Sequence, residues 1–175
     1  VNTPVIQSNG AGTSTAGLKV GGQTGPNPLT ANTEEWNNTC WAEVADLNVA
    51  KAQIGSGGTT TAAFAAVGTT EGASVVATNE IWNGTAWAEA GDANTARQLV
   101  YGLGTTTAGM IFGGYIAPNP QSIVETYDGS TWTEIGNLNT ASYGRGGSGT
   151  STLALAFAGS APTANTEEFD GSSWT

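Results

Sequence analysis

The sequence predicts an all-β protein built from one short unit that is repeated four times. In four places an aromatic residue is followed five positions later by tryptophan, across a turn rich in Asn, Asp, Gly and Ser. The tryptophans recur at intervals of 46, 45 and 42 residues, and a period of this length is typical of solenoids and propellers. The aromatic residues are Trp36, Trp41, Trp82, Trp87, Tyr127, Trp132, Phe169 and Trp174.

Composition and charge narrow the classes of partner. Of the 175 residues, 38% are hydrophobic and 10% are charged, which suits one compact unit with little charge to solvate long helices. The formal net charge of −10 repels a phosphate backbone, so we expect no nucleic-acid partner. No apolar run approaches the length of a membrane span, so we expect no membrane insertion.

The start of the chain and its cysteine bear on processing and redox state. The chain begins Val1-Asn2-Thr3-Pro4 without an initiator Met or a signal-peptide pattern, so we expect that something was removed or that this is a piece of a longer protein. Cys40 is the only cysteine, which rules out an internal disulfide and leaves the redox compartment open. Its position holds Ala, Thr or Ser in the other copies, which favours an ordinary small side chain over a reactive thiol.

Aligning the chain with itself gives one repeat domain over 1–175, with copies at about 2–47, 48–93, 94–138 and 139–175. Each copy opens on an asparagine. Ten residues later a glycine begins a Thr/Ser-rich turn and an apolar run that ends in glycine. The residues that open the copies are Asn2, Asn48, Asn94 and Asn139.

The third copy predicts four short strands, which we call a to d, at about 97–103, 108–113, 123–127 and 131–135. Asp128-Gly129 joins strands c and d, and such a pair adopts positive φ cheaply in a hairpin. Helix is not expected, because no segment keeps a 3.6-residue apolar period over three turns. A four-stranded antiparallel unit of about 45 residues is what a propeller blade requires.

These residues resemble the Kelch repeat, in which a glycine doublet ends the second strand and aromatics follow on the third and fourth. Gly21-Gly22 and Gly113-Gly114 match the doublet, whereas Val67-Gly68 and Ala158-Gly159 keep its second glycine. The c–d turn is shorter than the Kelch one, and this compact form is similar to Kelch-like arrays of bacteriophages and some bacteria. The resemblance implies a β-propeller of four blades with a structural or adhesive role, at a virion surface or outside the cell.

Two arrangements of the four blades are possible. A four-bladed ring would close without strand exchange, because the first copy starts at strand a and the last ends at strand d, and its closure would depend on apolar packing between these copies. The alternative is that the units form part of a larger propeller, completed by further chain or by another copy of the protein.

Positions that recur in every copy are expected to be structural, because they cannot define one asymmetric pocket. We expect the eight aromatics in the core, with a sugar-stacking platform as the alternative. The glutamates two residues before each first aromatic share its strand face. We expect them to accept hydrogen bonds from a neighbouring blade, in preference to a fourfold cation site or plain exposure. They are Glu34, Glu80, Glu125 and Glu167.

Lysine and arginine offer these carboxylates a counter-charge. Lys51 and Arg97 share one register position, and Arg145 lies further along the same predicted strand. We expect them to pair with the repeated glutamates in preference to forming an anion site.

The b–c loops hold all the variation in length, with 11, 11, 10 and 7 residues between the last strand-b glycine and the strand-c glutamate. Loops on a rigid scaffold are where binding usually resides, although drift in a tolerant loop is the alternative. We therefore expect these loops to bind a protein or a glycan. The candidate contact residues are Pro26, Asn27, Pro28, Glu71, Tyr115, Asn119, Gln121 and Pro162.

No constellation for catalysis is recognisable. Histidine is absent, and the symmetric carboxylates lack the two different environments that an acid and a base need. We expect no catalytic residue, metal or cofactor, and therefore no enzyme. The leading interpretation is a structural or adhesive propeller of a phage or bacterial surface assembly, and the alternative is a lectin with one site per blade.

Overall fold

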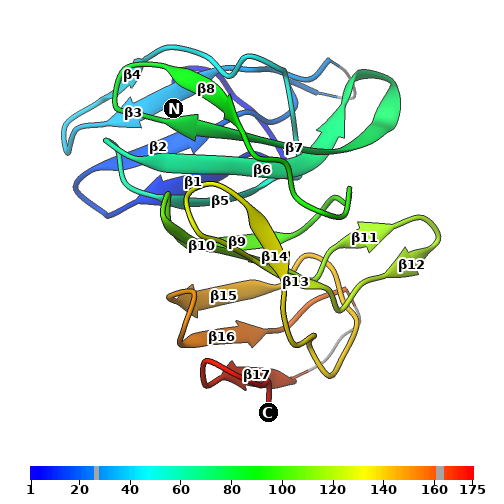
Figure 1. The fold of residues 1–175 in the computed structure, drawn as a ribbon. Coiled ribbons are helices and arrows are strands. Elements are labelled where there is room, and N and C mark those ends of the chain that lie inside the picture. The colour runs from blue at the N-terminus through cyan, green and yellow to red at the C-terminus, as the bar shows by residue number, and fades with distance from the viewer. Residues whose placement is uncertain (26–27, 161–163) are drawn as a thin grey trace.

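The computed structural model describes residues 1–25, 28–160 and 164–175, and it is an all-β structure. Four antiparallel sheets are arranged as the blades of a β-propeller, in chain order from blue to red in Figure 1. Within each sheet neighbouring strands are consecutive, apart from a small hairpin inserted in the third blade. The predicted fold class is confirmed.

In each blade the first strand along the chain is the innermost strand of the sheet. Blade 1 contains β1 (Asn9–Gly12), β2 (Gly17–Val20), β3 (Thr33–Trp36) and β4 (Trp41–Glu43). Blade 2 contains β5 (Gly55–Gly58), β6 (Ala63–Thr70), β7 (Ser74–Trp82) and β8 (Trp87–Ala90). Blade 3 contains β9 (Tyr101–Thr105), β10 (Ala108–Phe112), β13 (Val124–Tyr127) and β14 (Trp132–Glu134). Blade 4 contains β15 (Gly146–Gly149), β16 (Ala154–Phe157) and β17 (Thr166–Phe169), with an isolated bridge from Phe169 to Trp174.

The structure corrects two of the expected boundaries. Strand a of the third copy begins at Tyr101 and not at Arg97, because Leu99 has a positive φ of 57°, which lies outside the extended region that a strand needs. The second b–c loop is mostly strand: β6 and β7 extend past the predicted ends and meet at the short 3-10 turn η1 (Glu71–Ala73). In the third loop β11 (Tyr115–Ile116) pairs with β12 (Asn119–Pro120), forming a hairpin that protrudes from the molecule in Figure 1.

The glycine doublet marks a point where the backbone needs two successive positive φ angles. Gly113 and Gly114 have φ of 64° and 114°. In blade 2, Val67 stands at the first position with φ of 55° and Gly68 follows with 113°. The second position keeps glycine in every copy, because an L side chain is disfavoured in that part of the backbone map.

Neighbouring blades pack through their inner strands and through three apolar clusters. Strand β5 packs against both β1 and β9, and β9 packs against β15. One cluster joins blades 1 and 2, a second joins blades 2 and 3, and a third joins blades 3 and 4. At the second and third of these junctions the strand-d tryptophan packs on strand b of the preceding blade: Trp132 on Phe64 and Trp174 on Phe112, with ring centroids 5.7 and 5.6 Å apart.

The expected apolar closure between the first and last copies is wrong for the described part of the chain. No apolar cluster there contains residues of both blade 1 and blade 4. Leu155 and Phe157 of blade 4 are 40% and 41% exposed. The two chain ends also lie on opposite sides of the molecule in Figure 1.

Glycine at position 102 allows the inner strands of blades 2 and 3 to touch. A Cβ atom added to Gly102 would lie 2.5 Å from the backbone nitrogen of Ser56 and 2.7 Å from its oxygen. We expect Gly102→Ala to reduce the free energy of unfolding by about 1–3 kcal/mol, because backbone cannot move aside as a flexible side chain does. Urea unfolding measures the change. Gly17→Ala is the matched control, since the nearest atom there is 3.4 Å away and its cost should be well under half as large.

Candidate functional site

The turns between strands c and d are held by one side-chain oxygen each. Oδ1 of Asp128 accepts hydrogen bonds from the backbone N–H groups of Ser130 and Thr131, both at 2.8 Å. These bonds lower the pKa of Asp128 below its usual value. The same bonds recur at Asn37, Asn83 and Asp170. The Asn/Asp and Gly/Ser pattern of these turns is therefore architectural.

The recurrent aromatics lie at blade junctions and over turns. Trp82, Trp87, Tyr127, Trp132, Phe169 and Trp174 are all buried, while Trp36 and Trp41 of blade 1 are half-buried. Nε1 of Trp36 and of Trp82 donates to a carbonyl in the a–b turn of its own blade. A lectin that used one exposed ring per blade would need these rings at the surface, and blades 2 to 4 bury them.

The asparagine that opens each copy ties it to strands c and d of the same blade. The Asn48 N–H donates to Glu80 Oε2 at 2.7 Å, and its Nδ2 donates to the Trp87 carbonyl at 3.1 Å. Equivalent bonds form at Asn2, Asn94 and Asn139. The glutamates therefore bind backbone of their own blade, and the expectation of a neighbouring blade is wrong.

Each of these glutamates also forms a buried ion pair, as expected for the pairing with Lys51, Arg97 and Arg145. The Lys51–Glu80 and Arg145–Glu167 pairs measure 3.1 and 3.0 Å, and Arg97 pairs with Glu125. The sequence reasoning missed Lys19 on β2, which pairs with Glu34 at 3.4 Å. The sequence did hint at this pair. In copy 1 Val5 occupies the position of Lys51, so Glu34 needs a cation from another position.

The cation that pairs with the repeated glutamate thus comes from three different positions in the repeat. Lys19 comes from strand b, Lys51 and Arg97 precede strand a by several residues, and Arg145 is the residue immediately before strand a of its blade. A buried carboxylate requires a compensating charge, and a long basic side chain can reach it from several positions. Each of these carboxylates thus has a cation and backbone N–H groups as partners.

Burial and hydrogen bonding oppose each other in these pairs. Burial raises the pKa of Glu34, but the N–H groups of Asn2 and Thr3 and the Lys19 ammonium outweigh it, so that its pKa lies below its usual value. Burial lowers the pKa of Lys51 and of Arg97, although Glu80 and Glu125 act in the opposite direction.

The candidate b–c loop residues fall into two separate groups. Pro28 and Glu71 line one pocket. Tyr115, Asn119 and Gln121 belong to the β11–β12 hairpin and its exit, where the Tyr115 ring packs on Tyr143 with centroids 5.0 Å apart. The predicted contacts Pro26, Asn27 and Pro162 lie outside the described residues.

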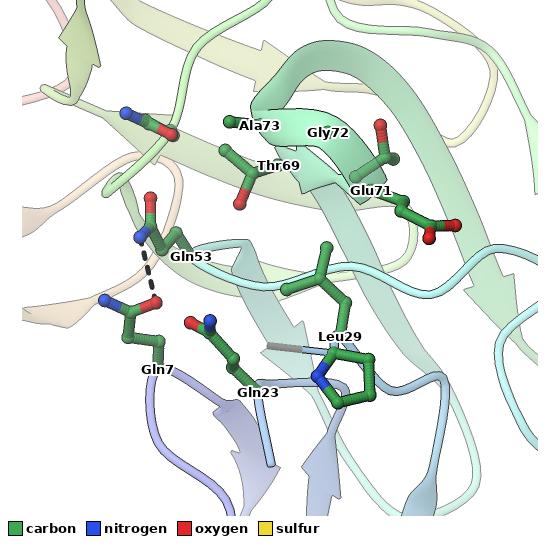
Figure 2. A pocket seen from close by; sticks show the side chains of 11 residues that line it. Gln7, Gln23, Leu29, Gln53, Thr69, Glu71, Gly72 and Ala73 are labelled. Atoms are coloured by element: carbon green, nitrogen blue, oxygen red, sulfur yellow. Dashed lines mark hydrogen bonds between the residues drawn. The ribbon is translucent and has the colours of Figure 1, made fainter. Parts of the chain in front are cut away.

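The pocket lies between the first two b–c loops and the segments that precede the inner strands. Its volume is about 740 Å³. In Figure 2 the turn Glu71–Ala73 and Leu29 border it on one side, and Gln7, Gln23 and Gln53 on the other. Gln53 Nε2 donates to Gln7 Oε1 at 2.9 Å. Gln53 Oε1 is buried and has no hydrogen-bond partner in the described structure.

Sequence reasoning found the loop half of this pocket and missed the glutamines. Gln7 and Gln53 occupy the same register position, five residues after the asparagine that opens their copies, and Gln98 adds a further amide from blade 3. Their recurrence in two copies was a visible signal. Leu99 and Gly144 replace them in copies 3 and 4, so this position is not uniform across the repeat.

Comparisons with known proteins add no relative: no protein-family model matches the chain, and no curated protein matches it. Within the described ranges there is no helix long and apolar enough to cross a membrane. The same residues contain no group of three or more His, Cys, Asp or Glu side chains placed to hold a metal ion.

Proposed function

We propose that this protein is a non-enzymatic, Kelch-like structural and adhesive module of a bacteriophage or bacterial surface assembly, located on a virion or outside the cell. Its b–c loops bind a glycan or a protein, and the pocket between blades 1 and 2 is the site. The observation that carries the proposal is that two loops chosen for their variability border a pocket with several amide side chains.

The lining of the pocket favours an uncharged ligand rich in hydroxyl groups, such as a glycan. Its volume of about 740 Å³ is in the range of roughly 300–1,000 Å³ typical of ligand sites. Glutamine amides carry both donors and acceptors, so the amides that line the pocket match hydroxyl groups. Pro28 and Leu29 supply apolar surface, while Glu71 disfavours an anionic ligand.

The non-enzymatic assignment rests on how the ionisable groups are used. The chain has no histidine, and the four repeated glutamates are engaged in ion pairs and backbone hydrogen bonds. The resemblance to compact Kelch-like arrays supports the phage or bacterial setting. The lectin with one aromatic site per blade is less well supported, because six of the eight recurrent rings are buried.

Gln53→Leu should weaken glycan binding about tenfold or more, because it removes an amide that lines the pocket and the bond to Gln7 while keeping a side chain of similar size. The binding glycan is first identified on a glycan array with the intact chain, and its affinity is then measured by calorimetry. Gln121→Leu is the matched control: it makes the same change beside the β11–β12 hairpin and should leave the affinity unchanged.

The opposite result, loss of binding in Gln121→Leu alone, would place recognition on the hairpin and reject the pocket. If neither variant changes the affinity, or if the array shows no ligand, the glycan assignment fails. Thermal unfolding of both variants confirms that the scaffold is intact.

A further inference from the structure

In blades 1 to 3 one face of the sheet packs against the next blade along the chain. The equivalent face of blade 4 is more exposed. Leu155 stands six residues after the glycine that opens the a–b turn, where the other copies have Leu18, Phe64 and Met110. These three are 3%, 0% and 0% exposed, whereas Leu155 is 40% exposed. Two residues on, Phe157 is 41% exposed and its counterparts Val20, Ala66 and Phe112 are fully buried. Blade 4 therefore exposes apolar side chains at positions that are buried in the other three blades.

The other junctions show what covers this face. Trp132 of blade 3 packs on Phe64 of blade 2, and Trp174 of blade 4 packs on Phe112 of blade 3. Trp87 of blade 2 joins the same cluster as Leu18 of blade 1. Next to Leu155, the corresponding place on blade 4 is a hollow of about 240 Å³. The strand-d tryptophan of a following blade is the side chain that fits this position.

Blade 1 presents the complementary half of the same interface. Trp41 is half-buried, whereas Trp87, Trp132 and Trp174 are each 5% exposed. Val5 is also half-buried, while Lys51, Arg97 and Ser142 at its register position are buried. One chain thus carries both halves of a blade junction on its two opposite ends.

Backbone hydrogen bonds between blades are interrupted at the same place. The N–H groups of Gln53, Leu99 and Gly144 donate to the carbonyls of Gln7, Gln53 and Leu99, at 2.9–3.0 Å. A second series joins strand-b glycines to the next blade, as from Gly68 to the Arg97 carbonyl at 2.9 Å. In the described structure the next donors and acceptors of both series have no backbone partner. They are Gln7 N–H, Gly144 C=O, Gly159 N–H and Val5 C=O.

We propose that blade 4 of one copy binds blade 1 of a second copy, head to tail, through the contacts of the internal junctions. Trp41 of the second copy covers Leu155 and Phe157 of the first, and the Gln7 N–H donates to the Gly144 carbonyl across the junction. Two such junctions close a ring of two chains with eight blades, which is within the range of roughly four to eight typical of propellers. This assembly does not depend on the ligand pocket.

The test uses two variants, each with one damaged face. Leu155→Lys damages the blade 4 face and Trp41→Gln damages the blade 1 face, so neither variant can form a sound junction with itself. We expect size-exclusion chromatography with light scattering to give a dimer of the 17.5 kDa chain for the unaltered protein and a monomer for each variant. An equimolar mixture should form a dimer again, because it contains one intact face of each kind.

Val49→Lys is the control for added surface charge. Val49 is an exposed apolar residue of blade 2 and remains exposed although this blade has both neighbours, so the variant should stay dimeric. If Trp41→Gln impairs folding, as judged by thermal unfolding, Val5→Asp replaces it. A monomeric unaltered chain at all concentrations would overturn the proposal. So would a dimer formed by Trp41→Gln alone or by Leu155→Lys alone, since each variant lacks one of the two faces that the proposed junction needs.

Discussion

Glu125→Gln is expected to reduce the free energy of unfolding by about 3–5 kcal/mol. The substitution keeps the shape of the side chain and an oxygen that can accept the N–H of Asn94, to which Glu125 Oε2 now binds at 2.6 Å. It removes the charge that compensates Arg97, which is fully buried. Loss of one partner of a buried ion pair leaves an uncompensated charge, which costs far more than the net contribution of the intact pair.

Urea unfolding followed by circular dichroism measures this cost. Glu71→Gln is the matched control: it makes the same chemical change on an exposed loop residue and should cost no more than about 0.5 kcal/mol. If Glu125→Gln does not fold, Arg97→Met with Glu125→Gln should recover a folded protein, because no unpaired charge is then buried. Equal stabilities for Glu125→Gln and Glu71→Gln would show that the pair is not a structural requirement.

The fold could be predicted because sequence signals that are weak on their own recur from copy to copy. A single Asn-Gly or Asp-Gly turn is common, but the recurrence of such a turn between two aromatic residues five positions apart fixes the register of the copies. The opening asparagines were visible as register marks. Their double role, binding Glu80 Oε2 and the Trp87 carbonyl in blade 2, could not be seen, since it joins residues 32 and 39 positions apart.

The missed features depend on distances in space that spacing along the chain does not encode. Lys19 reaches Glu34 from an adjacent strand, so a search for one shared register position could not find it. The second b–c loop becomes strand because β6 and β7 continue to pair beyond a bulge at Val67. Its Thr-rich sequence fits both loop and strand.

For a similar reason the sequence predicted the loop side of the binding pocket and not the glutamine side. Variability in length indicated the b–c loops, and it brought Pro28 and Glu71 into the candidate set. Gln7 and Gln53 belong to the inner segments, and only the folded arrangement brings them opposite those loops. The ends of the array were equally hidden, because copies 1 and 4 carry the same junction residues as the copies between them.

Trp132→Ala should reduce the free energy of unfolding by about 3–5 kcal/mol, because this tryptophan is 5% exposed and fills the junction between blades 2 and 3 against Phe64. Trp41→Ala removes the same side chain at the same register position, but Trp41 is half-buried at the open end of blade 1. At concentrations low enough for monomers, it should therefore cost less than half as much in urea unfolding. Equal costs at low concentration would mean that blade 4 of the same chain covers Trp41, which would close the ring within one chain. A cost for Trp41→Ala that grows with protein concentration is the result that head-to-tail assembly requires.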